Sequence, residues 1–435
     1  MPLKFELMSA TKITKTINAW CSYDIANSVY KLLITTVLFP IYYKAVTPNE
    51  IEIAGSFLKN TVVYDYALAL AFLLIAFVSP LLSGIADYGG HRKRFMMFFT
   101  FLGAAACAGM YLYNGNNLVY GFFVIIIAAI AYEGAVLFYN SFLPRIAAKS
   151  LHDRISARGY SWGYGGSMVL LIINLLIVLS AKGDEESVRF LGYSFLQVGL
   201  WWFAFSWIAF AFLKDDTCKH EKVGNLLTKG FAELQKVQKV IFKHKVTKRF
   251  LFSFFFYSMG LQTLMLVAIM FGEAEIGVGR VELITTIVIL QLVAIIGATF
   301  FGYISRLKGN KTSIIAMLFI WLAVCVGGFF VQTVVQFYFL AAGVGLVMGG
   351  IQSQSRSTFS KLIPRDTTDT ASYFSFYNFS EKMAIVFGMF SFGFIEHLTG
   401  SPRNSIIALG VYFIIALLIL WLTPLNSHFK NIDKD

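Results

Sequence analysis

The stretch "GIADYGGHRKRF" (residues 84–95) has a counterpart, "GYISRLKGNK" (302–311), in the second part of the chain. Each begins with a glycine, turns through another glycine and ends in basic residues. A second pair of segments, "FLPRIA" (142–147) and "KLIPRD" (361–366), repeats at nearly the same offset, about 218–220 residues. Two independent matches at one offset predict a structural unit that the chain uses twice.

The composition is that of a membrane protein. Of the 435 residues, 57% are hydrophobic and 14% are charged, whereas a soluble protein has about 25% charged residues. A membrane-spanning helix needs about 20 mostly apolar residues. Apolar runs of this kind, divided at charged, Gly, Pro or Asn residues, predict twelve spans, near 18–42, 65–86, 95–113, 118–140, 160–181, 191–213, 248–271, 281–304, 311–331, 334–353, 372–395 and 403–423.

Lysine and arginine residues are distributed unevenly between the two sides of these spans. If the N-terminus is cytoplasmic, 28 of the 36 lie in inner segments and six in outer segments, as the positive-inside rule requires. This distribution accounts for the net charge of +12 without nucleic acid as a partner. The longest inner segment, 214–247, is basic with apolar residues at helical spacing, which is typical of an amphipathic helix on a lipid surface.

The predicted fold is therefore an all-α membrane protein with twelve transmembrane helices in two pseudo-symmetric six-helix bundles. The N-terminal bundle comprises residues 1–213, the basic amphipathic linker residues 214–247, and the C-terminal bundle residues 248–435. Both termini are expected on the cytoplasmic side. Internal repeats of this kind are typical of secondary transporters, in which one half moves against the other around a central site.

The first of the two repeated loops has residue types suited to gating. Gly84 and Gly90 allow close helix approach and a tight turn. Asp87 lies near a helix end, where its carboxylate can accept hydrogen bonds from a neighbouring helix. Arg92 and Lys93 follow on the cytoplasmic side. We expect these five residues to act in gating rather than in contact with a solute.

This loop resembles the signature loop that the major facilitator superfamily carries between its second and third helices. Other segments resemble the vacuole-effluxer branch of that superfamily, whose fungal members are described as amino-acid exporters. These segments are "WCSYDIANSVY" (20–30), "FPIYY" (39–43), "FYNSFLPRIA" (138–147), "GYSWGYGG" (159–166) and "GGIQSQSRSTFSKLIP" (349–364). The resemblance extends from residue 20 to about residue 425. It implies the twelve-helix, two-bundle fold, transport by alternating access, and amino acids as solutes.

The first span carries polar residues in an otherwise apolar stretch, "YDIANSVYK" (23–31). Asp24, Asn27 and Lys31 share one helix face because they fall at i, i+3 and i+7. With a rise of about 1.5 Å per residue, Lys31 lies near mid-membrane, where a charge costs at least about 2.5–3.5 kcal/mol. Such a charge faces a cavity or a partner. Glu133 in the fourth span is the preferred partner of Lys31, with Asp24 and Glu381 as alternatives.

Further polar side chains in later spans complete the predicted site. The resemblance implies that spans 1, 4, 7 and 10 line the central cavity. The candidates for contact with solute or protons are Asp24, Asn27, Lys31, Glu133, Tyr139, Asn140, Gln262, Gln352, Arg356, Tyr377, Glu381 and Lys382.

Three roles remain open for these residues. In the first, an acid such as Glu133 or Asp24 takes up and releases protons and so couples transport to a proton gradient. In the second, Lys31 and Arg356 bind a carboxylate or phosphate of the solute while an acid binds its amine. In the third, the charges form an ion-pair network that fixes helix packing.

The sequence contains no P-loop, HExxH motif or nucleophile elbow, so we predict no enzymatic activity, cofactor or metal site. We expect a monomer in a bacterial inner (cytoplasmic) membrane. It would move a small polar solute, an amino acid or similar zwitterion, with export favoured and proton coupling possible. The alternatives are a proton-linked efflux pump for drugs or other amphiphiles, and a sensor or scaffold that keeps the fold without transporting.

Overall fold

The computed structural model describes residues 10–53, 55–215, 226–425 and 429. The first elements are α1 (Ala10–Val29), η1 (Tyr30–Leu38), α2 (Phe39–Val46), β1 (Glu50–Ile53), β2 (Ser56–Lys59), α3 (Asn60–Gly89), α4 (Arg92–Gly109), η2 (Met110–Leu112), α5 (Leu118–Ser141), α6 (Leu143–Ile146), η3 (Lys149–Leu151), α7 (His152–Leu179) and α8 (Asp184–Phe212). After these come α9 (Leu226–Lys243), α10 (Lys245–Phe271), η4 (Gly272–Ile276), α11 (Arg280–Lys308), α12 (Asn310–Phe330), α13 (Val334–Leu362), α14 (Thr370–Thr399) and α15 (Pro402–Trp421).

Eleven helices among the described residues are long and apolar enough to cross a membrane. They coincide with eleven of the predicted spans, and α1, η1 and α2 together form the first. The remaining predicted span, 372–395, corresponds to α14, which has 30 residues. Helix α14 carries Glu381 and Lys382 near its centre, so its most apolar stretch is less apolar than those of the other eleven spans. The prediction of an all-α membrane protein is confirmed.

One short hairpin departs from the all-helical prediction. Strands β1 and β2 pair antiparallel, with Ile51 opposite Leu58, in the segment between the first two spans. Ile51 is buried, whereas Phe57 is 68% exposed. Strand β1 reads EIEI, which is the alternation of a half-buried strand, but four residues are too few to distinguish it from a loop in the sequence.

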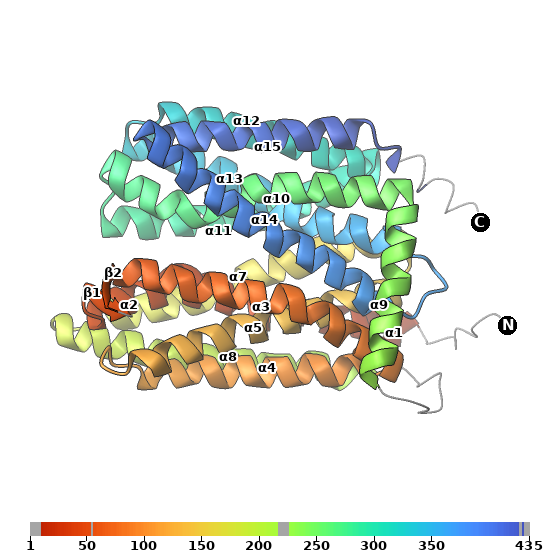
Figure 1. Ribbon diagram of the computed structural model, residues 1–435, viewed down its shortest axis with the longest axis horizontal. Coiled ribbons are helices and arrows are strands. Elements are labelled where there is room, and N and C mark those ends of the chain that lie inside the picture. Colours follow the sequence, from red (N-terminus) through yellow and green to blue (C-terminus); the bar gives the residue numbers. More distant parts are fainter. Residues whose placement is uncertain (1–9, 54, 216–225, 426–428, 430–435) are drawn as a thin grey trace.

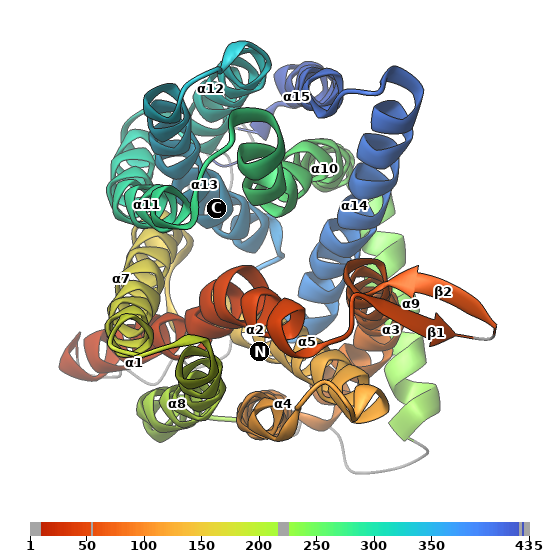
Figure 2. The same cartoon turned by 90° about the vertical axis from the view of Figure 1, so that its left-hand side faces the viewer.

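The helices form two groups that lie side by side. Figure 1 shows α1–α8 in one group and α10–α15 in the other, and Figure 2 shows the same groups from one end. Each group has its own core of buried apolar side chains. One core comes from residues 17–213 together with Ala371, and the other comes from residues 237–425 together with Tyr164. We call the two groups the N-half and the C-half.

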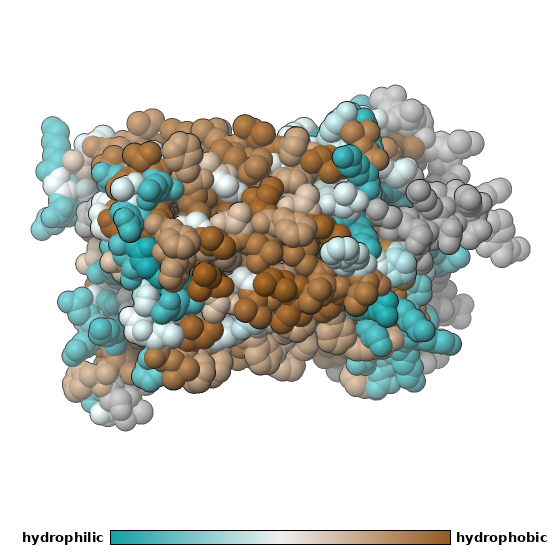
Figure 3. Space-filling view, turned by 90° about the horizontal axis from the view of Figure 1, so that it is seen from above, coloured by the Kyte–Doolittle hydropathy of each residue, from teal (hydrophilic) through white to brown (hydrophobic). Residues whose placement is uncertain are grey.

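The middle of the molecule is apolar and its two ends are polar. Figure 3 shows a broad hydrophobic band between hydrophilic ends, as expected of helices that cross hydrocarbon. We call the end that carries the start of α1 and the end of α15 the terminal face, and the other end the opposite face. At the terminal face, α9 runs across the ends of the other helices (Figure 1).

Helix α9 contacts both halves. Gly230 of α9 meets Gly84 of α3 so closely that a Cβ at Gly230 would lie 2.8 Å from the backbone nitrogen of Ile85. Farther along α9, Val237 and Ile241 belong to the core of the C-half. Within the predicted linker, residues 216–225 lie outside the described residues. Helix α9 therefore joins the two halves at the terminal face.

Helices α11 and α13 of the C-half lie in backbone contact. A Cβ added at Gly345 of α13 would lie 2.5 Å from the carbonyl oxygen of Leu290 in α11, and Gly297 and Gly349 lie similarly close to the facing backbone. Small residues allow such close approach between membrane helices. The contact fixes α13, which also carries Arg356.

We predict that Gly345→Ala destabilises the protein by about 1–3 kcal/mol, because the added methyl group must displace α11. The matched control is Gly393→Ala in α14, where an added Cβ meets no atom within 4 Å. There the substitution is neutral or stabilising, since alanine favours the helix. Thermal unfolding of the detergent-purified variants measures both effects. Equal unfolding midpoints for the two variants would contradict the close contact.

Candidate functional site

A cavity of about 260 Å³ lies between the two halves. Its walls combine α1, η1, α3, α5 and α7 of the N-half with α10, α11, α12, α13, α14 and α15 of the C-half. All the residues predicted to contact solute or protons line this cavity: Asp24, Asn27, Lys31, Glu133, Tyr139, Asn140, Gln262, Gln352, Arg356, Tyr377, Glu381 and Lys382.

The cavity extends toward the opposite face. Asp24 and Arg356 form its end nearer the terminal face. At its other end lie Phe271, Leu283 and Phe337, which belong to the last turn of α10 and the first turns of α11 and α13. Because the polar contacts between the halves cluster at the terminal face, this conformation is closed there.

Three charged side chains form a network in the cavity wall. Lys382 Nζ lies 2.6 Å from Glu133 Oε1 and 3.4 Å from Glu381 Oε2. Gln262 Nε2 donates a hydrogen bond of 2.8 Å to Glu381 Oε1. The predicted pairing of Lys31 with Glu133 is therefore wrong. Helix α14 brings Lys382 against α5, and the Lys382 ammonium forms the ion pair with the Glu133 carboxylate.

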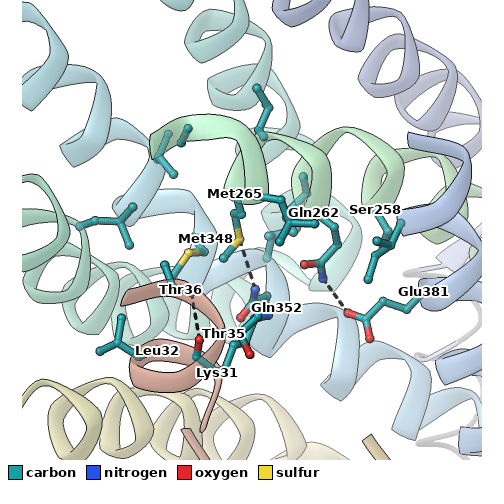
Figure 4. A pocket seen from close by; sticks show the side chains of 18 of the residues that line it. Lys31, Leu32, Thr35, Thr36, Ser258, Gln262, Met265, Met348, Gln352 and Glu381 are labelled. Atoms are coloured by element: carbon teal, nitrogen blue, oxygen red, sulfur yellow. Dashed lines mark hydrogen bonds between the residues drawn. The ribbon is translucent and has the colours of Figure 1, made fainter. Parts of the chain in front are cut away.

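Lys31 lies on the cavity wall in η1, a π-helix of nine residues. Thr36 Oγ1 donates to the Lys31 carbonyl oxygen at 2.9 Å (Figure 4). Among the described residues, none forms a hydrogen bond or ion pair with the Lys31 ammonium, although the charges of Glu381, Lys382 and Glu133 act on it from a greater distance. A cation at this depth is stabilised by water or by a solute in the cavity. Irregular π-helical turns are frequent at functional sites.

Arg356 fills the end of the cavity nearer the terminal face. Its Nη2 lies 3.2 Å from Asp24 Oδ2 and donates to the Ser156 carbonyl oxygen at 3.0 Å. Its Nε donates to Ser156 Oγ at 2.9 Å, and its Nη1 donates to Asn140 Oδ1 at 3.3 Å. Tyr139 donates its hydroxyl proton to the same Asp24 oxygen at 2.7 Å. In this conformation Arg356 therefore binds Asp24 rather than a solute anion.

The remaining predicted residues complete the wall between these two networks. Gln352 Oε1 accepts a hydrogen bond of 2.9 Å from the Tyr164 hydroxyl, and its Nε2 faces the Met265 sulfur at 3.8 Å (Figure 4). Tyr377 stacks on a phenylalanine of α10 with ring centroids 4.1 Å apart. Asn27 is buried beside Asp24 on the same helix face. The cavity thus has polar groups at both networks and a mostly apolar wall elsewhere.

The predicted gating loop includes a contact between the halves. Asp87 pairs with Arg92 at 2.8 Å and accepts hydrogen bonds from the backbone N–H groups of Ala371 and Ser372, at 3.2 and 2.7 Å. Arg92 donates to the carbonyl oxygen of Thr368. Ala371 and Ser372 belong to the first turn of α14, where free N–H groups and the helix dipole favour a carboxylate. The loop of the N-half therefore binds a helix of the C-half.

The other members of the loop hold it in position. Gly84 contacts α9, and Gly90 follows α3 with φ 68°, a left-handed conformation that favours glycine. The backbone N–H of Lys93 donates to Asp215 Oδ1 at 2.7 Å. Asp87 and Arg92 are thus the members of the loop that reach the C-half.

A second acid, which the sequence analysis missed, also joins the halves at the terminal face. Asp153 at the start of α7 accepts hydrogen bonds from Ser305 at 3.0 Å, Asn310 at 2.8 Å and Lys361 at 2.6 Å, and another from a serine of α13. Ser305 occupies, in the second loop, the position that Asp87 has in the first. The second loop lacks an acid there, and Asp153 supplies one from the N-half. The absence of an acid from the second loop was therefore the feature of the sequence that could have pointed to a partner such as Asp153.

Helix α9 adds a charged cluster at the same face. Lys236 lies 2.6 Å from Glu233 Oε1 and 3.3 Å from Asp369 Oδ2. Burial and a hydrogen bond to Asp369 raise the pKa of Glu233 above its ordinary value. Asp369 immediately precedes α14, so this cluster joins α9 to the helix that Asp87 also binds.

Residues 12–432 match the family model described as vacuole effluxer Atg22 like. The chain belongs to this family. The uncharacterized MFS-type transporter YxiO of Bacillus subtilis is 29% identical over 418 residues, which cover 95% of this chain and 96% of YxiO. Autophagy-related protein 22 of Saccharomyces cerevisiae (strain ATCC 204508 / S288c) is 26% identical over 418 residues, which cover 83% of this chain and 76% of the yeast protein.

Solved structures show the fold of this effluxer-family chain. The transporter FucP in its outward conformation has a TM-score of 0.71 at 13% identity, covering 94% of this chain and 98% of FucP. The proton:xylose symporter XylE has a TM-score of 0.74 at 10% identity, covering 96% of this chain and 97% of XylE. The predicted major facilitator fold and effluxer branch are confirmed. The relatives and structural neighbours are transporters, so the expectation that the chain is no enzyme is also confirmed.

We predict that Asp87→Asn loosens the first turn of α14. The carboxylate accepts two backbone N–H groups, and hydrogen bonds to a charged group are each worth about 1.5–3 kcal/mol. Amide hydrogen exchange at Ala371 and Ser372 should therefore accelerate about 10- to 100-fold. The matched control is Asp366→Asn, an exposed acid just before α14, which should leave these rates unchanged. Wild-type exchange rates in the Asp87 variant would contradict the contact.

Proposed function

We propose that this effluxer-family transporter moves a small zwitterionic solute, in the first place an amino acid, by alternating access. The observation that carries the proposal is the Lys31 ammonium, which faces the cavity without an ion-pair partner among the described residues. A cation at this depth needs an anion or water. A solute carboxylate meets that need through charge-assisted hydrogen bonds, which are about twice as strong as neutral ones.

Glu381 offers the complementary group for the ammonium of the solute. Its side chain is 22% exposed, and it lies 3.4 Å from Lys382, whereas Glu133 lies 2.6 Å from the same ammonium. A carboxylate has about four acceptor positions, so Glu381 has room for a further donor. A zwitterion bound by Lys31 and Glu381 adds no net charge to the membrane interior.

Glu133 is the acid we propose for proton coupling. It shares Lys382 with Glu381, so the two acids compete for one cation. When a proton neutralises Glu133, Lys382 is free to pair fully with Glu381 and to displace the ammonium of the solute. Burial disfavours a charged carboxyl group and an ion pair favours it, so a change in pairing changes which acid holds the proton.

The assignment we favour is export across a bacterial inner (cytoplasmic) membrane. In this assignment both termini are cytoplasmic and the protein is a monomer. The description of the family as effluxers supports export, and the near full-length similarity to the Bacillus subtilis relative supports a bacterial membrane. The excess of basic residues in the segments of the terminal face supports a cytoplasmic terminal face. In this orientation the cavity of the present conformation faces outward.

A second candidate is efflux of amphiphilic compounds, and the cavity wall favours it. Away from the two charged networks the wall is largely apolar, with Met265, Met348 and Leu290 among its residues. Methionine is flexible and adapts to ligands of different shape. An amphiphilic cation would bind to this apolar wall and to one of the acids, and it would not need Lys31. The effect of replacing Lys31 on transport therefore distinguishes the two candidates.

We predict that Lys31→Gln raises the KM for the transported amino acid at least about 10-fold, because loss of one partner of a desolvated charge pair costs about 2 kcal/mol or more. The measurement is uptake of a panel of labelled amino acids into proteoliposomes. The matched control is Lys44→Gln, an exposed lysine of α2 near the opposite face, which should transport normally. An unchanged KM in the Lys31 variant would contradict the proposed carboxylate site. Absence of amino-acid flux in the wild type would reject this solute class.

We predict that Glu133→Gln uncouples transport from the pH gradient. The variant cannot exchange a proton at this position, so uptake driven by an imposed gradient should be lost. Exchange of labelled for unlabelled solute at equal pH should persist, because it requires no net proton movement. If the variant retained gradient-driven uptake, the proton-coupling residue would be Asp24 or Glu381 instead of Glu133.

A further inference from the structure

The guanidinium of Arg356 lies in a cage of aromatic rings. Its Cζ is 4.7 Å from the centroid of Trp20, 5.4 Å from that of Tyr139 and 4.2 Å from that of Tyr160. Trp20 stacks on Tyr139 at 4.4 Å, and its indole N–H donates to the Tyr139 carbonyl oxygen at 3.0 Å. Aromatic faces attract cations, and a planar guanidinium also stacks on them.

The polar contacts of the guanidinium complete this cage. Asp24 supplies the negative charge, and Asn140 and Ser156 supply further acceptors at 2.9–3.3 Å. Together with the three rings, these groups match both the flat faces and the edge donors of a guanidinium.

Every one of these contacts comes from the N-half. Trp20 and Asp24 belong to α1, Tyr139 and Asn140 to α5, and Ser156 and Tyr160 to α7, whereas Arg356 belongs to α13 of the C-half. The N-half therefore contains a complete guanidinium receptor, and the C-half supplies its occupant. We name these six residues of the N-half the guanidinium cage.

We propose that the guanidinium cage binds solutes that carry a guanidinium group when the terminal face opens, and that such solutes oppose its closure. The proposal rests on alternating access, as in the proposed function, but not on the identity of the transported solute. When the halves separate at the terminal face, α13 withdraws Arg356 and leaves Asp24 without its cation. A buried carboxylate without a partner is unfavourable, so a free guanidinium gains the interactions that Arg356 has left.

The experiment removes the Arg356 side chain from the cage by substitution and then adds a free guanidinium ligand. Arg356→Ala is purified in detergent, and binding of ethylguanidinium is measured from the rise in the midpoint of thermal unfolding. Arg356→Gln, which keeps a polar side chain at the position, is the second variant should the alanine variant not fold. Ethylammonium has the same charge without the planar donors and is the control ligand. The double variant Arg356→Ala with Asp24→Asn is the control protein.

The proposal predicts saturable binding of ethylguanidinium to the Arg356 variants. Binding should be at least tenfold weaker for ethylammonium, for the double variant and for the wild type, in which Arg356 competes for the cage. Absence of saturable binding in both single variants, or equal binding by the wild type, would overturn the proposal.

A further variant tests the dependence on conformation with Arg356 in place. Asp153→Ala leaves the cage intact but removes an acid that joins α7 to α11, α12 and α13. If opening of the terminal face empties the cage, this variant should bind ethylguanidinium severalfold more tightly than the wild type. Affinity no higher than that of the wild type would overturn the proposed link between opening and binding. These measurements need no transport assay, so their failure is distinct from a failure of the proposed amino-acid transport.

Discussion

A charge in the interior of a membrane protein needs a partner, and this constraint organises the centre of the molecule. Of the charged residues that line the cavity, Arg356 is paired with Asp24, and Lys382 is paired with Glu133 and Glu381. The pairs Arg356–Asp24 and Lys382–Glu133 cross between the halves, whereas Glu381 lies beside Lys382 on α14. Removing one member of a buried pair leaves an uncompensated charge and costs about 3–5 kcal/mol, so in this conformation each half depends on charges that the other supplies. Lys31 is the exception, and the proposed function follows from it.

The terminal face joins the halves through two acids that are placed differently in the two repeats. Asp87 belongs to the first repeated loop and binds the start of α14, whereas Asp153 lies on α7 and binds the second loop and α13. The two repeats therefore reach a similar result with different residues. Contacts of this type are discrete, being either made or broken, and so suit a protein with two alternative conformations. Helix α9, bound to both halves, adds a third connection at the same face.

Much of the fold and of the cavity lining could be predicted from the sequence, because the cost of charge in hydrocarbon leaves a clear signal. Residues such as Asp24 and Glu133 stand out in apolar spans, and the structure places them on the cavity wall. Their partners could not be predicted in the same way. The pairing of Glu133 with Lys382 depends on how α14 lies against α5, and one sequence does not specify that arrangement.

One further feature lacked a usable signal in the sequence, and another left only an indirect one. The π-helix η1 changes which side chains of the first span share a face, and the run YKLLITTVL reads as an ordinary apolar helix. Asp153 resembles any acid in the first turn of a helix, where acids are common. Its role becomes visible only when the second repeated loop, which has Ser305 in place of an acid, is seen beside it.

The central claim is that the ionic contacts of the terminal face hold one of two alternative arrangements of the halves. Distances between pairs of spin labels test it most directly, with one pair at Arg94 and Arg306 on the terminal face and another at Asn116 and Gln332 on the opposite face, all exposed positions. When Asp87 and Asp153 are both replaced by alanine, the account predicts a longer distance at the terminal face together with a shorter one at the opposite face. Unchanged distances at both faces, or lengthening at both, would contradict it.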